Sequence, residues 1–173
     1  MGCGSSSNKM KVPFSELDKM YIRETWVQFS DGGIVESGQH LFLKMFEKRP
    51  DIKDLFLYSK DGNVASKMFG KNRQFNNHVR RVFEMLGSVV SNLDEYWDVE
   101  PLLVSLGSKH ATFALQKDYF LLFGDCLMYS LERKLGDKLT PEAKQAWHRM
   151  VKFVIPLMIS GWTIGTAKLK GHG

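Results

Sequence analysis

Two histidines have surroundings suited to metal ligands, because each shares the apolar face of a different predicted helix. His78 lies in FNNHVRRVFEML at 75–86, on one face with Phe75 and Val82. His110 lies in LGSKHATF at 106–113 and follows Leu106 at an interval of four residues. A single histidine on an apolar face is more often a core residue with a hydrogen-bond partner. Two on separate helices shift the balance toward a shared ligand.

Imidazole nitrogen is a good ligand for haem iron and for zinc, and the two sites need different partners. A zinc site needs a third and usually a fourth ligand, yet the sequence has no H-x-x-x-H pair and no pair of neighbouring cysteines. Its two cysteines are Cys3 and Cys126, and Cys126 is most simply a buried apolar residue. From the spacing alone, the two histidines are either core residues or the two ligands of a bis-histidine haem site.

The stretch MGCGSSSN at 1–8 predicts a different chemistry, covalent lipid attachment. It matches the myristoylation pattern, with Gly2 exposed after removal of the initiator methionine and Ser6 at the required place. A single myristoyl chain binds membranes marginally, and stable attachment takes a second signal. Palmitoylation of Cys3 would supply it. We expect acyl chains in the inner leaflet to hold the chain at the cytoplasmic face of the plasma membrane. Without acyl chains, we expect the protein to be cytoplasmic.

Composition restricts the class of protein further. The 173 residues suit one domain, and 12 Phe, 9 Met and 4 Trp provide bulky apolar material around a large flat ligand. The net charge of +5 includes no block of Lys and Arg, so no nucleic-acid partner is expected. The longest apolar stretch, FVIPLMIS at 153–160, is shorter than the roughly 20 residues of a spanning helix. Membrane contact is therefore expected to be peripheral.

The elements that must position the two histidines are all predicted to be helices. Apolar residues recur at three and four positions, and no strand-like alternation appears. Ser15 with Asp18 predicts the first helix start, and Thr140 with the following proline predicts the last. Pro156 is expected to kink the last helix. The predicted helices are about 33–48, a turn from Pro50, 72–91, one from Pro101, 117–135 and 141–168, with an irregular connection at 58–70.

The chain resembles the globin family over about residues 15–168, which leaves a disordered tail at 1–14 and a short one at 169–173. The segments HVRRV, LFLY, LGSKH and LTPEAKQAW are similar in sequence to the neuroglobin and globin X members. The positions that match the family are Trp26, Gly38, Pro50 with Phe56 six residues later, His78, His110, Trp147 and the GW at 161–162.

This resemblance implies an all-α globin fold of about eight helices enclosing one haem b. It also implies that His110 is the proximal iron ligand and that His78 binds the distal side reversibly. Phe56 would stack on the haem, and Phe42 would fill the distal side. Further haem contacts are implied for Val82 over the ring and for Tyr58 and Arg81 at a propionate. For Phe42 and Val82 core packing is the alternative, and for Arg81 a solvated charge.

Three functions are compatible with such a site. We favour a membrane-tethered redox or gas-sensing protein that binds O2, NO or CO and exchanges electrons with a partner that the sequence does not name. An enzyme, either a nitrite reductase or an NO dioxygenase, would use the same two histidines. Simple oxygen storage or transport comes last, because a bound distal histidine and a membrane tether both oppose it.

Overall fold

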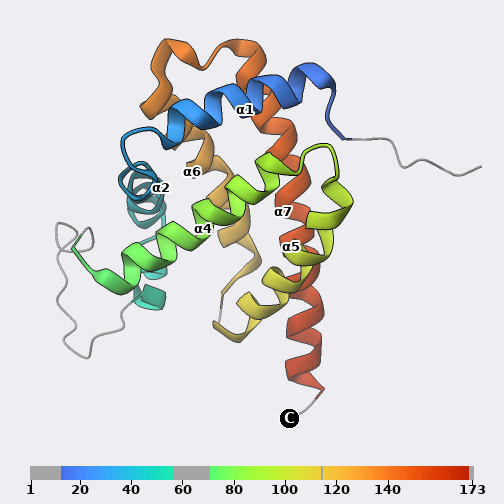
Figure 1. Cartoon of the computed structure of the whole chain (residues 1–173). Coiled ribbons are helices and arrows are strands. Elements are labelled where there is room, and N and C mark those ends of the chain that lie inside the picture. The colour runs from blue at the N-terminus through green and yellow to red at the C-terminus, as the bar shows by residue number, and fades with distance from the viewer. Residues whose placement is uncertain (1–12, 57–70, 114, 172–173) are drawn as a thin grey trace, which may run out of the picture.

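The described parts of the chain consist of helices joined by short connections, as Figure 1 shows. The computed structural model describes residues 13–56, 71–113 and 115–171. No strand occurs in these parts, and the predicted all-α class is confirmed. The elements are α1 (Glu16–Ser30), α2 (Ile34–Lys48), η1 (Pro50–Phe56), α4 (Arg73–Ser91), α5 (Tyr96–His110), η2 (Ala111–Phe113), α6 (Lys117–Leu135), η3 (Gly136–Lys138) and α7 (Pro141–Lys170).

Side-chain caps explain where three of these helices begin. The Ser15 hydroxyl accepts from the Asp18 N–H at 3.1 Å, and the Asp18 carboxylate accepts from the Ser15 N–H at 2.9 Å. This reciprocal pair is the predicted capping box. Asn72 caps α4 by accepting from two backbone N–H groups, and Thr140 caps α7 by accepting from the Ala143 N–H at 3.2 Å. Each cap satisfies donors that the first helical turn leaves unpaired.

The prediction that Pro101 opens a helix is wrong, because α5 begins five residues earlier at Tyr96 and includes this proline. A proline near the start of a helix removes one hydrogen bond, and packing offsets that loss. Tyr96 and Val99 in the first turn are buried, and the Tyr96 ring packs edge-on against Phe153 with centroids 5.5 Å apart. Burial of this turn decides the helix start.

Both ends of the helical body differ slightly from the predicted boundaries of 15 and 168. Phe14 is buried and packs edge-on against Phe153, so ordered packing starts one residue earlier. Helix α7 continues to Lys170 and passes through Pro156 without a break. By length and composition alone, α7 is the one described helix that could cross a membrane. Its contacts with α1, α5 and α6 are those of a core helix.

Two close helix crossings fix the relative positions of the helices that carry the histidines. A Cβ at Gly107 of α5 would collide with the carbonyl of Met158, and one at Gly161 of α7 with the carbonyl of Val104. The backbones of α5 and α7 are therefore in contact, side by side in Figure 1. At Gly38 of α2, a Cβ would lie 2.6 Å from side-chain atoms of α4. This second crossing depends on the absence of a side chain at Gly38.

The remaining core lies between α1, α4 and α7 and is rich in aromatic side chains. Trp26 packs against Phe83 and Trp147, with centroids 6.4 and 6.1 Å apart. The fully buried Trp147 donates its indole N–H to the Thr25 hydroxyl at 2.8 Å. Cys126 of α6 is fully buried, as predicted, and burial raises the pKa of its thiol to about 11. The thiol is therefore a protonated core group.

Candidate metal centre

His78 of α4 and His110 of α5 line one cavity, together with side chains from α2, η1, α6 and α7. The empty space between these side chains, including its opening to solvent, is about 1100 Å³. Twenty residues line it, and all but the two histidines and Tyr119 are apolar. The sequence separates the two histidines by 32 residues, and the fold brings both to the same apolar space.

A backbone hydrogen bond fixes the tautomer of His110. Its Nδ1 lies 2.8 Å from the carbonyl oxygen of Leu106, one helical turn earlier. A carbonyl can only accept, so Nδ1 carries the proton and Nε2 carries the lone pair. The ring also packs edge-on against Phe120 of α6, with centroids 5.9 Å apart. Nε2 is therefore the nitrogen of His110 that is free to bind a metal.

The His78 imidazole is held by aromatic rings and by burial. Its centroid lies 5.1 Å from that of Phe56 and 5.5 Å from that of Phe42, edge-on in both cases. Burial is the main cause that lowers the pKa of His78 to about 4, with smaller electrostatic contributions from His110 and Arg81. A histidine with this pKa is neutral near pH 7, which is the form that binds a metal.

The chemistry of the donors fits haem better than a bare metal ion. In the residues that the structure describes, no three His, Cys, Asp or Glu side chains come together at a site that could hold a metal ion. Zinc sites need at least three protein ligands. Two imidazoles in an apolar cavity instead suit a flat, mostly apolar cofactor whose metal brings four ligands of its own.

The structure brings several of the sequence-predicted site residues together. Phe42, Phe56 and Val82 line the cavity with the two histidines, and Phe42 and Phe56 contact each other with centroids 5.6 Å apart. Arg81 is exposed and follows His78 on α4. Tyr58 lies outside the described residues, as do Gly2 and Cys3. The roles of these residues toward haem stay predictions.

Sequence reasoning missed a polar cluster at the cavity wall. Tyr119 of α6 lines the cavity and donates its hydroxyl to Asp51 of η1 at 2.5 Å. Arg49 donates to the same carboxylate at 3.0 and 2.8 Å and holds the pKa of Asp51 well below its usual range, as does the Tyr119 hydrogen bond. The three side chains join the η1 corner to α6. No sequence signal predicts a contact between residues 51 and 119.

The chain is similar to known proteins over most of its length. Residues 39–158 match the family model described as Globin. The neuroglobin of Danio rerio is 34% identical over 148 residues, which are 86% of this chain and 92% of that protein. The neuroglobin of Tetraodon nigroviridis is 31% identical with the same coverage. The similarity expected from LFLY, LGSKH and LTPEAKQAW therefore extends over most of the chain.

Two solved structures have the same fold at low sequence identity. A hexacoordinated haem protein from an anhydrobiotic tardigrade superposes with a TM-score of 0.80 at 22% identity, over 88% of this chain and 97% of that one. The neuroglobin of the acoel Symsagittifera roscoffensis superposes with a TM-score of 0.71 at 21% identity, over 85% and 97% respectively. The three chains therefore share one fold.

Proposed function

The chain belongs to the globin family, and from this premise we propose that it binds one haem b with His110 and His78 as the two axial iron ligands. Haem binding itself follows from the family. The observation that carries the proposal is that both imidazoles line one otherwise apolar cavity. The hydrogen bond from His110 to Leu106 supports the permanent proximal role, because it presents Nε2 as the ligand atom.

The other cavity residues would bind the cofactor through its apolar faces and its charged edge. Phe42, Phe56 and Val82 offer apolar contacts. Arg81 is exposed on the helix of His78, where its guanidinium suits a carboxylate. A bound haem iron supplies reversible binding of diatomic gases and one-electron exchange.

His78 would control access to the distal side. When its imidazole is a ligand, O2, NO, CO or nitrite must compete with it, so the apparent affinity falls with the fraction of molecules in which His78 has moved away. If that fraction is about 1%, the apparent affinity is about a hundredfold below the intrinsic one. This competition favours sensing or electron transfer over oxygen storage.

The proposed place of action is the cytoplasmic face of the plasma membrane. It is supported by the sequence match at Gly2, Ser6 and Cys3. Myristoyl and palmitoyl chains together would supply the two signals that stable attachment requires. A haem protein held there could exchange electrons with a membrane-associated or cytoplasmic reductase.

The test of the haem ligands is the visible absorption spectrum of the haem-loaded chain in the ferric and dithionite-reduced forms. The parent chain is expected to give sharp, split ferrous bands, because both axial positions are filled by imidazole. His78→Leu should convert them to a single broad five-coordinate band. His148→Leu, a substitution of an exposed histidine on α7, is the matched control and should leave the split bands unchanged.

A single broad ferrous band already present in the parent chain would contradict bis-histidine ligation. The distal side would then be open, and oxygen binding would become the first interpretation.

A further inference from the structure

One end of the molecule exposes apolar side chains among lysines. Phe113 of η2 is 60% exposed, and Ile164 and Leu169 of α7 are 44% and 53% exposed. Such residues usually occur singly on a surface, and a cluster rimmed by charge indicates a binding surface. We call this region the tip surface and define it as Phe113, Ile164, Leu169, Lys109, Lys117 and Lys170.

Contacts between η2 and the last turns of α7 bring the tip surface together. A Cβ on Gly165 would lie 2.8 Å from the Cβ of Ala111, so η2 packs directly on this part of α7. The Trp162 indole donates to the carbonyl of Leu115 at 3.1 Å, which ties the chain beyond η2 to the same helix. Leu169 follows Gly165 by one turn and therefore lies on the same face of α7.

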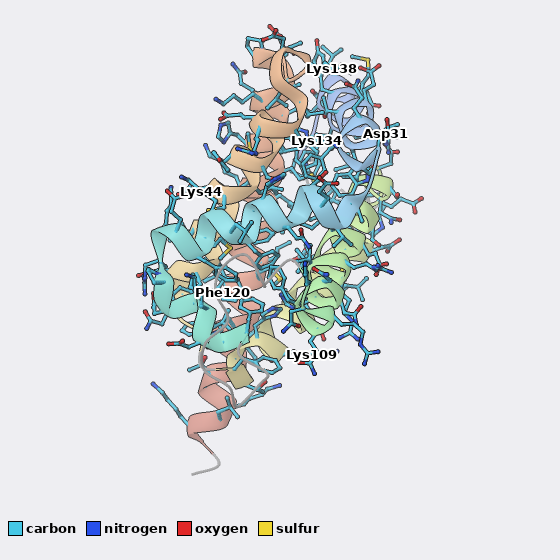
Figure 2. The ribbon with its side chains drawn as sticks, turned by 90° about the vertical axis from the view of Figure 1, so that its left-hand side faces the viewer. Asp31, Lys44, Lys109, Phe120, Lys134 and Lys138 are labelled. Atoms are coloured by element: carbon cyan, nitrogen blue, oxygen red, sulfur yellow. The ribbon has the colours of Figure 1, made fainter. Side chains whose placement is uncertain are left out.

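The views of the whole chain agree with this placement. In Figure 1 the C-terminal ends of α5 and α7 lie at the same end of the molecule, the lower end of the view. Figure 2 labels Lys109, the residue before the last of α5, near that end. The tip surface is thus built from chain segments that are far apart in sequence.

The chain segments that form the tip surface carry mostly positive charge. Residues 107–118 and 160–171 contain four lysines and one acidic residue, Asp118. Lysines near a membrane surface are attracted to anionic lipid, and apolar side chains beside them enter the boundary between headgroups and acyl chains. A partner recognised by charge alone would not need protruding Phe, Ile and Leu side chains. Both features of the tip surface match an anionic bilayer.

We propose that the tip surface docks on anionic lipid bilayers and so orients the globin at the membrane. This rests on the membrane location proposed above and adds an orientation to it, through residues that bind without any acyl chain. Phe113 also lines the cavity. Docking through this residue therefore places the rim of the cavity beside the bilayer.

The experiment uses the haem-loaded full chain, made without N-myristoyltransferase so that no acyl chain contributes. Its cosedimentation is measured with vesicles of phosphatidylcholine alone and of phosphatidylcholine containing phosphatidylserine. We expect binding to the anionic vesicles that weakens with added salt. Ile164→Ser with Leu169→Ser, both outside the cavity lining, should lower that binding about tenfold, and Lys109→Gln with Lys170→Gln about tenfold or more.

The matched control is Leu17→Ser with Val27→Ser, two comparably exposed apolar residues of α1 that are 62% and 68% exposed. This pair should bind the vesicles as the parent chain does. The proposal is overturned if the tip and control pairs bind alike, or if neutral and anionic vesicles are bound equally. It is also overturned if light scattering shows a dimer that only the tip pair disrupts, because a second copy would then cover the surface.

Acylation at the N-terminus is tested independently of docking through the tip surface. It is tested in cells through Gly2, whereas the vesicle assay contains no acyl chain.

Discussion

The side chains of the two cavity histidines differ in the contacts that fix their orientation. His110 has a 2.8 Å hydrogen bond from Nδ1 to the Leu106 carbonyl, and its ring contacts Phe120. For His78, the described residues provide ring contacts with Phe42 and Phe56 and no hydrogen bond. A side chain without a hydrogen bond rotates at lower cost. This asymmetry suits a permanent ligand at residue 110 and a reversible one at residue 78.

The buried position of His78 predicts a pH dependence of stability in the haem-free chain. Its pKa is about 4 in the folded protein, against 6.5 for the ordinary side chain. Between these two values the unfolded chain binds a proton that the folded chain does not, so the free energy of unfolding falls as the pH falls. The loss should reach about 2 kcal/mol at pH 5 relative to pH 7.5.

The measurement is urea unfolding of the haem-free chain at pH 7.5 and pH 5, for the parent and for His78→Leu. The substituted chain lacks the titrating group, so its loss of stability between the two pH values should be smaller by that amount. Equal losses in both chains would show that His78 is not protected from protonation by the fold.

At the scale of the elements, the crossing of α5 and α7 positions His110. Gly107 and Gly161 let the two helices approach until a Cβ would meet a backbone carbonyl. A side chain can move away from such a contact, whereas a helical carbonyl cannot without breaking its own hydrogen bond. The close approach therefore depends on glycine at these two positions.

Gly161→Ala should destabilise the folded chain. The added Cβ would collide with the carbonyl of Val104, and overpacking of this kind costs about 3 kcal/mol. Alanine regains about 1 kcal/mol of helix propensity. The expected net loss is about 2 kcal/mol in the free energy of unfolding, measured with urea.

Gly171→Ala is the control for this substitution. Gly171 ends α7 with φ −82°, and the nearest atom to an added Cβ is 3.6 Å away. Its stability should change by less than about 0.5 kcal/mol. If both substitutions have the same effect, the α5–α7 contact is looser than the structure indicates.

At the scale of the whole molecule, the proposed N-terminal signal and the folded body would have separate tasks. The signal would attach the chain to a membrane, and the body would bind haem. In cells, Gly2→Ala should move the protein from the membrane fraction to the soluble fraction, because it removes the myristoyl acceptor. Cys3→Ser should give partial release, because one acyl chain binds only marginally.

Fractionation of cell lysates followed by immunoblotting measures both effects, and the haem spectrum of the soluble protein shows that folding is unchanged. A Gly2→Ala chain that still fractionates with membranes would contradict acylation. In that case, vesicle binding through Phe113 and Leu169 would be the alternative means of attachment.

The sequence by itself determined the helical class and most helix limits, because capping residues and apolar periodicity are local. Ser15, Asn72 and Thr140 act within their own first turns. The resemblance also pointed to His78 and His110, and the fold brings both to one cavity, while their role as iron ligands stays a prediction. For the start of α5, local signals were insufficient, since Pro101 is a good first residue and burial of Tyr96 outweighs it.

Only the tertiary structure decided which distant side chains share a space. Tyr119 of α6 meets Asp51 of η1, and Phe120 of the same helix meets His110 of α5. The tip surface exists because η2 packs on the end of α7. Such contacts depend on how closely helices approach, and that distance is set by pairs of residues, such as Gly107 and Met158, whose effect is not visible in either segment alone.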